Sequence, residues 1–405
     1  MRHVAILGFG REGRALLRYL HRENQRAKIT ILDRKLDPDY LKNLDNFDTV
    51  YRSPGVPYNR PEIQHAIRKG VKFSGATAVF FERAKGQTIG VTGTKGKGTT
   101  STLIHKILKN AGYDAHLAGN IGKPAITILN KLKNSSITVL ELSSFQLQDL
   151  KRSPRIAAVL GLFPDHMDAH RNFKEYFEAK SNITRFQNKK DRVFYIADNK
   201  YAAAIAKRSH GTRVKVDIHS IDPSSLKIAG PHNLKNAAMA AAVARSLGVP
   251  KKIISKTIRN YRGLPYRLQY LTTIKGARIY NDSASTNPMT TAAAIRAFSE
   301  PKVLIVGGRD KNLDYAPVAK ALRKSDTKLV VLYGECREKI RRAIKGAAPL
   351  KMVSGNLETA FKIALSAAKP NSVIVFSPGA TSFDMFKDYS DRGERFTAIV
   401  RKFCR

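Results

Sequence analysis

Residues 90–100 read GVTGTKGKGTT and are the stretch of the sequence best suited to chemistry. A glycine-rich turn between a strand and a helix exposes backbone N–H groups that cradle phosphates, and Lys97 adds a positive charge beside them. A strict P-loop places Ser or Thr directly after this lysine to reach Mg²⁺, but that position is Gly98, so we expect Thr99 to supply the hydroxyl. The stretch predicts a nucleotide-phosphate site rather than a lysine-rich surface turn.

Two further groups of polar side chains follow later apolar runs. Glu141 lies at the end of the run 137–142, and DHMDAH at 165–170 follows the run 157–162. Ligand sites of parallel α/β sheets form at the carboxyl ends of strands. Beside a phosphate loop we predict Glu141 as a ligand of Mg²⁺ and His166 as a second metal ligand. The simpler alternatives are a strand-end charge and a loop histidine.

A second glycine pattern opens the chain. Gly8, Gly10 and Gly13 follow the apolar run that begins at Val4, and Asp33 ends the next apolar run. A dinucleotide fold uses such a GxGxxG turn for phosphate and an acid about 20 residues later for ribose. A tight turn that binds nothing requires the same glycines, so the motif alone leaves both interpretations open.

Strand-like and helical patterns alternate along the whole chain, which predicts an α/β protein. We expect strands at residues 4–8, 28–32, 88–92, 137–142, 157–162, 277–280, 303–306, 329–332 and 373–376, and helices at 15–20, 99–108, 173–186 and 233–247. The pattern restarts after Ala84 and again after the Gly-Leu-Pro at 263–265. We therefore predict three domains, at residues 1–84, 85–263 and 264–405.

Composition excludes several other classes of protein. Hydrophobic residues make up 42% of the 405 residues, and the two cysteines, Cys336 and Cys404, form no metal-ligand or disulfide spacing. This favours a globular protein of a reducing compartment. The N-terminus lacks the pattern of a signal peptide, and no apolar run is long enough to span a membrane. We expect a cytoplasmic protein, with a monomer as the default.

The net charge of +40 favours binding of polyanions and makes a basic nucleic-acid-binding ATPase an alternative. Lys and Arg are scattered through every segment, however, with only brief clusters such as 189–192. A general compositional bias explains this distribution as well as a dedicated groove does. We therefore expect no nucleic-acid partner.

Taken together, these motifs resemble those of the Mur ligases. The likeness runs through nearly the whole chain in order: the phosphate loop, GNIG at 119–122, ELSSFQ at 141–146, DHMD at 165–168, GPHNLKN at 230–236, GLPYR at 263–267, NDS at 281–283, GGRDK at 307–311 and SPGATSFDMFK at 377–387. It is strongest to the members that join D-glutamate to UDP-N-acetylmuramoyl-L-alanine in peptidoglycan precursor synthesis.

The resemblance implies a Rossmann-like N-terminal domain that binds the UDP sugar. It also implies a central P-loop-type ATPase domain with a mostly parallel sheet, and a Rossmann-like C-terminal domain that binds the amino acid and closes over the others. It implies ATP, two Mg²⁺ ions and an acyl-phosphate intermediate. Lys180 would be carbamylated by CO₂ and would help to hold the second Mg²⁺, which requires a lowered pKa of the amine.

The resemblance also assigns residues to each ligand. Catalysis would use Lys97, His166 and Lys180, and the metal ligands would be Thr99, Glu141, His166 and Lys180. ATP would contact Gly93, Thr94, Lys95, Gly96, Lys97, Gly98, Thr99, Thr100, Asn233, Asn236, Arg267 and Asp282. The UDP sugar would contact Gly8, Gly10, Arg11, Glu12, Asp33, Arg34, Ser53, Pro54, Gly55, Asn120, Ser143 and Gln146. The amino acid would contact Thr286, Lys311, Ser382 and Tyr389, with helix capping and surface charge as the alternative for this last group.

Three positions depart from the family pattern. Gly98 replaces the usual hydroxyl residue, Ala284 stands where lysine is common after Asp-Ser, and Tyr266 replaces a common histidine before Arg267. A catalytically silent nucleotide-binding relative is therefore an alternative. A ligase of the folylpolyglutamate synthase type is another, because its phosphate loop is similar, but the nucleotide-type unit before Ala84 argues against it.

Overall fold

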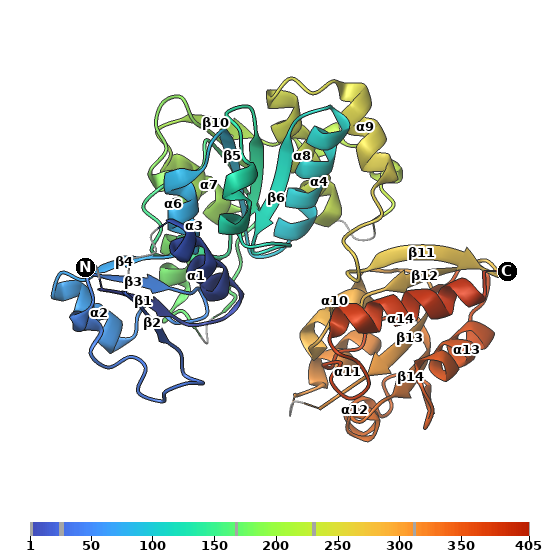
Figure 1. The fold of residues 1–405 in the computed structure, drawn as a ribbon. Coiled ribbons are helices and arrows are strands. Elements are labelled where there is room, and N and C mark those ends of the chain that lie inside the picture. Colours follow the sequence, from blue (N-terminus) through green and yellow to red (C-terminus); the bar gives the residue numbers. More distant parts are fainter. Residues whose placement is uncertain (1–2, 24–27, 167–168, 229–231, 311–312, 405) are drawn as a thin grey trace. The chain divides into compact units, whose positions relative to one another are not determined.

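The structure is a computed structural model that describes residues 3–23, 28–166, 169–228, 232–310 and 313–404. Its elements are α/β throughout, arranged on three sheets (Figure 1). The chain divides into two compact units, Met1–Asp222 with Leu234–Ile258, and Pro223–Asn233 with Arg259–Arg405. The domain boundaries at 84 and 263 stay predictions. Among the described helices, none is both long and apolar enough to cross a membrane.

The N-terminal sheet has four parallel strands in the order β2-β1-β3-β4. Its elements are β1 His3–Leu7, α1 Arg11–Glu23, β2 Lys28–Leu32, η1 Leu44–Asn46, β3 Thr49–Arg52, α2 Pro61–Arg68, β4 Lys72–Ser74 and α3 Ala76–Arg83. Alternate side chains of β1 point to opposite faces, because successive residues of a strand do so. Ala5 and Leu7 pack under α2, whereas Ile6 packs with α1 and α3.

The central sheet is parallel, in the order β10-β9-β8-β5-β7-β6. Its elements are β5 Gln87–Thr92, α4 Lys97–Asn110, β6 Ala115–Gly119, η2 Ala125–Lys131, β7 Ile137–Glu141, α5 Ser144–Leu147, β8 Ile156–Val159, α6 Phe173–Arg185, β9 Arg192–Tyr195, α7 Lys200–Lys207, β10 Thr212–Lys215, η3 Ile218–Ser220, η4 Pro223–Ser225, α8 His232–Ser246 and α9 Lys251–Asn260. The inner strands β5, β7 and β8 are buried, as their continuous apolar runs predict. Their carboxyl ends share one edge.

The C-terminal sheet has the order β11-β12-β16-β13-β14-β15, in which β11 alone of these strands is antiparallel to its neighbour. Its elements are β11 Gln269–Ile274, β12 Ala277–Asn281, α10 Pro288–Arg296, β13 Lys302–Gly307, α11 Ala316–Leu322, β14 Thr327–Tyr333, α12 Arg337–Ile344, β15 Leu350–Met352, α13 Leu357–Ala367, β16 Val373–Phe376 and α14 Tyr389–Lys402. Helices α13 and α14 cover one face, and α10 to α12 cover the other (Figure 1).

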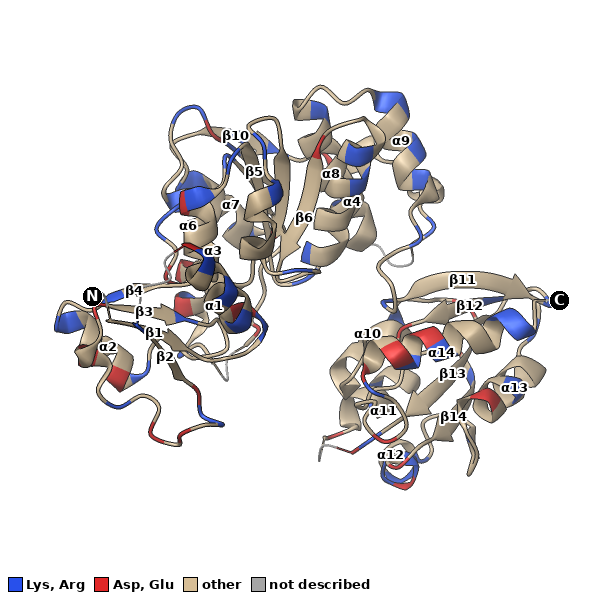
Figure 2. Cartoon of the chain, viewed as in Figure 1, with Lys and Arg blue, Asp and Glu red and all other residues tan. Residues whose placement is uncertain are grey.

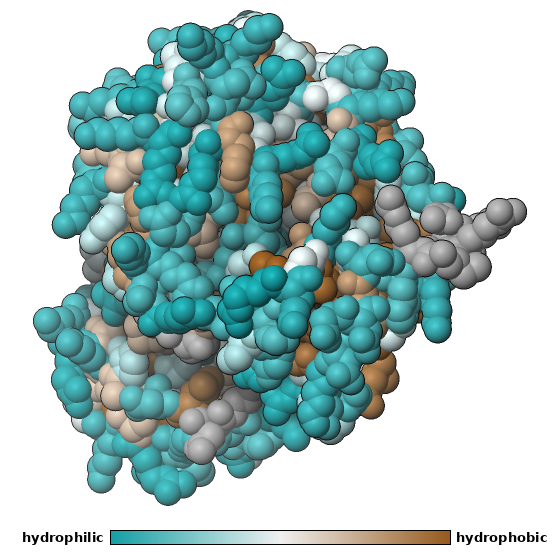
Figure 3. Space-filling view, turned by 90° about the vertical axis from the view of Figure 1, so that its left-hand side faces the viewer, coloured by the Kyte–Doolittle hydropathy of each residue, from teal (hydrophilic) through white to brown (hydrophobic). Residues whose placement is uncertain are grey.

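Lys and Arg residues are spread over helices and loops of both units (Figure 2). The face drawn in Figure 3 is mostly hydrophilic, and its apolar side chains form small separate groups. The charge of +40 is therefore not gathered on one element.

Candidate active site

The phosphate loop joins β5 to α4 at the carboxyl edge of the central sheet. Lys97 is the first residue of α4, and its Nζ donates to the carbonyl oxygens of Gly93 at 3.1 Å and Thr94 at 3.0 Å. The ammonium therefore lies over the backbone of the loop, beside a helix N-terminus whose dipole favours anions. The arrangement suits a phosphate group.

Thr94 fixes this loop to two other elements. Its hydroxyl accepts from the backbone N–H of Phe163 at 2.9 Å and lies 2.9 Å from the hydroxyl of Tyr176 on α6. Burial raises the pKa of Tyr176 to about 12, so this phenol stays protonated at neutral pH. Thr94 thus positions the loop through its side chain.

Position 96 requires a glycine. Its φ is +86°, and a Cβ there would lie 2.2 Å from Oδ1 of Asn236 on α8. The same Oδ1 accepts from the hydroxyl of Thr100 at 3.4 Å. The structure thus brings three of the predicted ATP residues together. Lys95 is exposed, and Gly98 and Thr99 are half-buried on the first turn of α4.

Lys180 lies on α6 with its whole side chain buried. Its Nζ donates to Thr92 Oγ1 at 3.3 Å and lies 4.8 Å from the centre of the Tyr176 ring. Burial, and then the charge of Lys97, lower the pKa of Lys180 well below its usual value, although Asp165 and Glu141 oppose this. Burial therefore favours the neutral form of this amine, which lies next to the phosphate loop.

Glu141 ends β7 and is buried at the same edge. Its Oε1 accepts from the side-chain amide of Asn120 at 2.8 Å, and no hydrogen bond from the described part of the chain reaches Oε2. Mg²⁺ prefers oxygen ligands, and this carboxylate together with the Thr99 hydroxyl supplies that type of donor. The residues present therefore fit Mg²⁺, although within the described ranges no cluster of three His, Cys, Asp or Glu side chains is placed around one point.

His166 sits in a left-handed turn, with φ of +58°. Half of its side chain is exposed, and its Nε2 lies 3.8 Å from Asp165 Oδ2. The ring packs edge-on against Phe145, with the ring centres 5.2 Å apart. His170 is buried instead, with its ring stacked on that of Phe145 at 5.1 Å between ring centres, and its Nε2 lies 3.0 Å from Ser144 Oγ. His166 is therefore the accessible imidazole of the two.

The N-terminal glycine turn is held by side chains of the next strands. Ser53 Oγ donates to the carbonyl of Gly8 at 2.6 Å, and a Cβ on Gly13 would lie 2.3 Å from that same oxygen. Asp33 accepts from the backbone N–H of Phe9 at 2.6 Å, which with a second bond from Lys35 lowers the pKa of Asp33. Asp33 therefore has a structural role in the glycine turn, and this role does not depend on a bound ribose.

The other residues predicted for the UDP sugar lie near this turn or at α5, apart from Asn120, which follows β6 and bonds Glu141. Arg11 Nη1 donates to the carbonyl of Gly122 at 3.0 Å. Ser143 caps α5 and exchanges hydrogen bonds with Gln146. Gly10 and Arg34 are exposed, whereas Pro54 is half-buried and Gly55 is exposed.

The predicted residues of the C-terminal unit form two groups. Asp282 is buried and accepts from Leu268 N at 3.0 Å, Ser285 Oγ at 2.5 Å and Ser377 Oγ at 2.8 Å, and burial raises its pKa to about 6. Its carboxylate thus has three partners within the protein. Arg267 lies in the turn that precedes β11.

The predicted amino-acid residues lie on three segments of this unit. Thr286 is half-buried, Ser382 is buried, and Tyr389 begins α14 with 45% of its surface exposed. The carbonyl of Tyr389 accepts from Ser283 Oγ at 2.8 Å. Lys311 lies outside the described residues.

Comparison with known proteins identifies the family. The sequence model of the Mur ligase middle domain matches residues 91–225, and that of the Mur ligase glutamate ligase domain matches 266–379. A protein of Aquifex aeolicus named UDP-N-acetylmuramoylalanine–D-glutamate ligase is 34% identical, covering 98% of this chain and 97% of its own length. A protein of the same name from Acetivibrio thermocellus is 32% identical over 98% of this chain and 96% of its own length. The chain belongs to the Mur ligase family.

Solved structures agree with this Mur ligase in fold. The UDP-N-acetylmuramate-alanine ligase of Thermotoga maritima superposes with a TM-score of 0.59 at 18% identity, covering 99% of this chain and all of the other. E. coli FolC in complex with ADP gives 0.58 at 16% identity, but covers only 82% of this chain and 93% of its own.

Several residues of this Mur ligase site carried no usable signal in the sequence. Thr92 and Tyr176 contact Lys180, and Arg52 joins β3 to the segment after α5. Each acts through partners distant in sequence, which only an alignment or a structure reveals. Arg52 directly precedes Ser53, Pro54 and Gly55, which were predicted to contact the UDP sugar, and this is the local signal that could have pointed to it.

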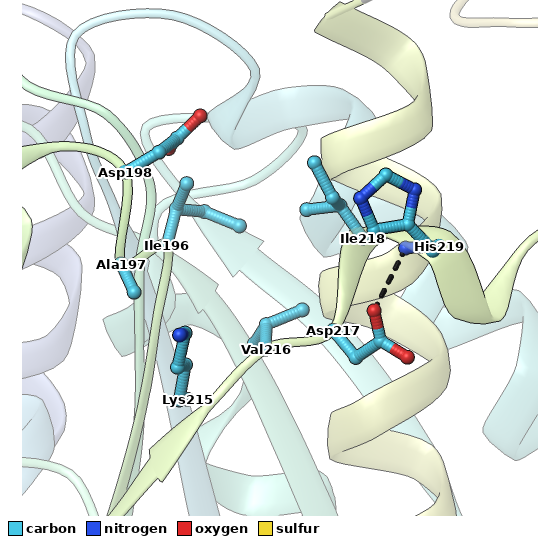
Figure 4. Close-up of a pocket in the computed structure, with 8 residues that line it drawn as sticks. All are labelled: Ile196, Ala197, Asp198, Lys215, Val216, Asp217, Ile218 and His219. Atoms are coloured by element: carbon cyan, nitrogen blue, oxygen red, sulfur yellow. Dashed lines mark hydrogen bonds between the residues drawn. The ribbon is translucent and has the colours of Figure 1, made fainter.

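A pocket of about 580 Å³ opens at the carboxyl ends of β9 and β10 in this Mur ligase (Figure 4). Ile196 and Val216 supply apolar surface, and Asp217 accepts from the backbone N–H of His219 at 2.9 Å. Asp198 forms an ion pair with Lys235 of α8. None of the predicted site residues lines the pocket.

Proposed function

We propose that this chain is an ATP-dependent ligase that joins D-glutamate to UDP-N-acetylmuramoyl-L-alanine in cytoplasmic peptidoglycan precursor synthesis. The observation that carries the proposal is the full-length identity of 30% or more to proteins named for this reaction. The chain retains the phosphate loop, the strand-end carboxylate and the buried lysine in one place, which argues against a silent relative.

The three sheets support a division of labour. In this proposal the N-terminal sheet is a Rossmann-like domain that binds the UDP sugar at the glycine turn. The central sheet binds ATP at the phosphate loop, and the C-terminal unit, also Rossmann-like, binds D-glutamate near Thr286, Lys311, Ser382 and Tyr389. The boundaries at 84 and 263 separate these roles.

The first chemical step transfers the γ-phosphoryl group of ATP to the substrate carboxylate. Such transfer depends mainly on positioning and electrostatics. Lys97 places positive charge against the transferring group, while Gly96 and Asn236 shape the loop around it. Bound Mg²⁺, held by Thr99, Glu141, His166 and carbamylated Lys180, would offset the charge of the phosphates.

Lys180 suits modification by CO₂. Its burial favours the neutral amine, whose nitrogen can bond to the carbon of CO₂ and lose one proton to give a carbamate. That change gives the side chain anionic oxygen donors at a place where the charges of Lys97 and Glu141 already act on Lys180. The second chemical step is attack of the glutamate amine on the acyl phosphate, with loss of phosphate.

The test is release of inorganic phosphate from Mg-ATP by the purified protein. Release that requires both UDP-N-acetylmuramoyl-L-alanine and D-glutamate is expected. Release with L-glutamate or another amino acid instead would change the assigned substrate, and release with no amino-acid dependence would overturn the ligase assignment.

A further inference from the structure

The one-turn helix α5 and the residues after it are held by one residue of α1 and one residue of β3. Glu12 on α1 accepts from the Gln146 side-chain amide at 2.6 Å. Arg52, the last residue of β3, donates through Nε to Asp149 Oδ2 at 2.9 Å. α1 and β3 of the N-terminal part thus contact the four-residue helix α5 and Asp149, which follows it.

Arg52 uses all three nitrogens of its guanidinium. Nη2 donates to the Phe145 carbonyl at 2.8 Å, and Nη1 donates to the Val56 carbonyl at 2.7 Å. The group also lies 5.2 Å from the centre of the Tyr58 ring, and the residue is only 3% exposed. A planar fork with this many partners has one orientation, which a lysine cannot reproduce.

The bond to Phe145 reaches the proposed metal site. The Phe145 ring lies edge-on against His166 and is stacked on His170, and the neighbouring Ser144 hydroxyl lies 3.0 Å from His170 Nε2. The rings of His166 and His170 therefore rest on α5. Since Arg52 fixes the backbone of α5, it also fixes the surface against which His166 packs.

The other end of the connection reaches the N-terminal glycine turn. Ser53, directly after Arg52, donates to the Gly8 carbonyl at 2.6 Å. The Arg52–Ser53 pair thus bonds the glycine turn on one side and α5 on the other. A displacement of β3 relative to the central sheet would be transmitted to Phe145 through two covalently adjacent residues.

We propose that Arg52 is a positioning residue which, through Asp149 and Phe145, orients His166 for Mg²⁺ and couples the glycine turn to the metal site. The inference rests on the proposed function, which it deepens. In this proposal Arg52 does not contact the substrate directly. Arg52 acts on the reaction through the α5 segment alone.

The experiment compares Arg52→Met and Arg52→Lys with the wild type in the full-length protein. Phosphate release is measured against Mg²⁺ concentration, and Mn²⁺ binding in the presence of ADP is measured by electron paramagnetic resonance. Because loss of a residue that orients a metal ligand costs about 10- to 100-fold in metal affinity or activity, we expect a shift of that size in both readouts for Arg52→Met. Arg52→Lys should be intermediate, and KM for D-glutamate should not change.

Arg278→Met serves as the control, since it removes an arginine–carboxylate pair with Glu300 in the other compact unit. It should leave both metal readouts unchanged. A folded Arg52→Met protein with wild-type metal dependence would overturn the inference. Should that variant not fold, the same result for Arg52→Lys would do so. If the wild type shows no glutamate-dependent phosphate release, the proposed function fails, and Mn²⁺ binding still decides the coupling.

Discussion

The side-chain nitrogen of Lys180 donates to the hydroxyl of Thr92 at 3.3 Å, and that hydroxyl in turn donates to the Leu142 carbonyl at 2.9 Å. Thr92 ends β5, and Leu142 directly follows β7. The lysine therefore attaches α6 to the point where two central strands end beside the phosphate loop. Its nitrogen is held by a neutral group in a buried site, which disfavours the charged form.

Replacement of Lys180 by methionine should separate stability from activity. The lowered pKa means that the folded state binds this proton less well than the unfolded state, so the group costs stability below the unfolded pKa, and stability rises with pH toward that value. The apo variant should therefore unfold at a higher temperature than the wild type at pH 7, yet lose ligase activity. Calorimetry and phosphate release measure the two effects. A lower melting temperature would contradict the assigned electrostatics.

Replacement of Lys97 by methionine should leave the fold intact and abolish most turnover. Loss of one preorganised positive or hydrogen-bonding group from a reacting centre costs about 100- to 1000-fold in kcat. The variant should show an unchanged circular dichroism spectrum and melting temperature. Retained turnover at the wild-type rate would remove Lys97 from the phosphoryl-transfer site.

Replacement of Gly96 by alanine should weaken ATP binding, because the new Cβ would lie 2.2 Å from Asn236 Oδ1. Gly112 gives a matched control. It follows the C-terminal end of the same helix with φ of +85°, and a Cβ there meets nothing within 4 Å. Both variants carry the backbone cost of about 1 kcal/mol for a left-handed residue. Titration with ATP should show a raised Kd for Gly96→Ala alone, and equal Kd values in the two variants would contradict the contact.

Replacement of Asp282 by asparagine should change how stability depends on pH. Burial raises the pKa of Asp282 to about 6 from 3.8, so the folded state holds the proton that the unfolded state loses first. The stability that this provides is complete below about pH 4 and is lost as pH rises through 6. A difference of about two units corresponds to about 3 kcal/mol. Denaturant unfolding of wild type and variant between pH 4 and 7 measures it, and parallel curves would refute the shift.

The sequence predicted the elements that carry the site better than the contacts within it. The runs at 28–32 and 373–376 coincide with β2 and β16, because short runs rich in Ile, Val, Thr and Phe are strong strand signals. The carboxyl ends of parallel strands share one edge of a sheet. Because Glu141 and the phosphate loop each lie at the end of a strand, their proximity could be predicted from the sequence. The short strands β3, β10 and β15 were not predicted, because runs of three or four mixed residues resemble loops.

Side-chain roles were harder to predict for a physical reason. A carboxylate such as Asp282 can bind a ligand or satisfy buried hydroxyls, and only the three internal partners distinguish these uses. Asp33 is a second case, since its bond to Phe9 N braces the turn. Lys180 shows the opposite, because a helix lysine that composition would place in water is fully buried. Such outcomes depend on long-range packing, which local patterns do not contain.

The bond between Arg52 and Asp149 also bears on the order in which the chain can fold during synthesis. Its two residues are 97 positions apart, and Ile126 of η2 packs into the same N-terminal core as Ile6. The N-terminal sheet therefore emerges from the ribosome before Ile126, which completes its packing, and before Asp149, which pairs with its buried arginine. A fragment that stops at residue 84 would expose Arg52 and part of the N-terminal core. The N-terminal sheet therefore gains its full stability only after the central residues have been synthesised.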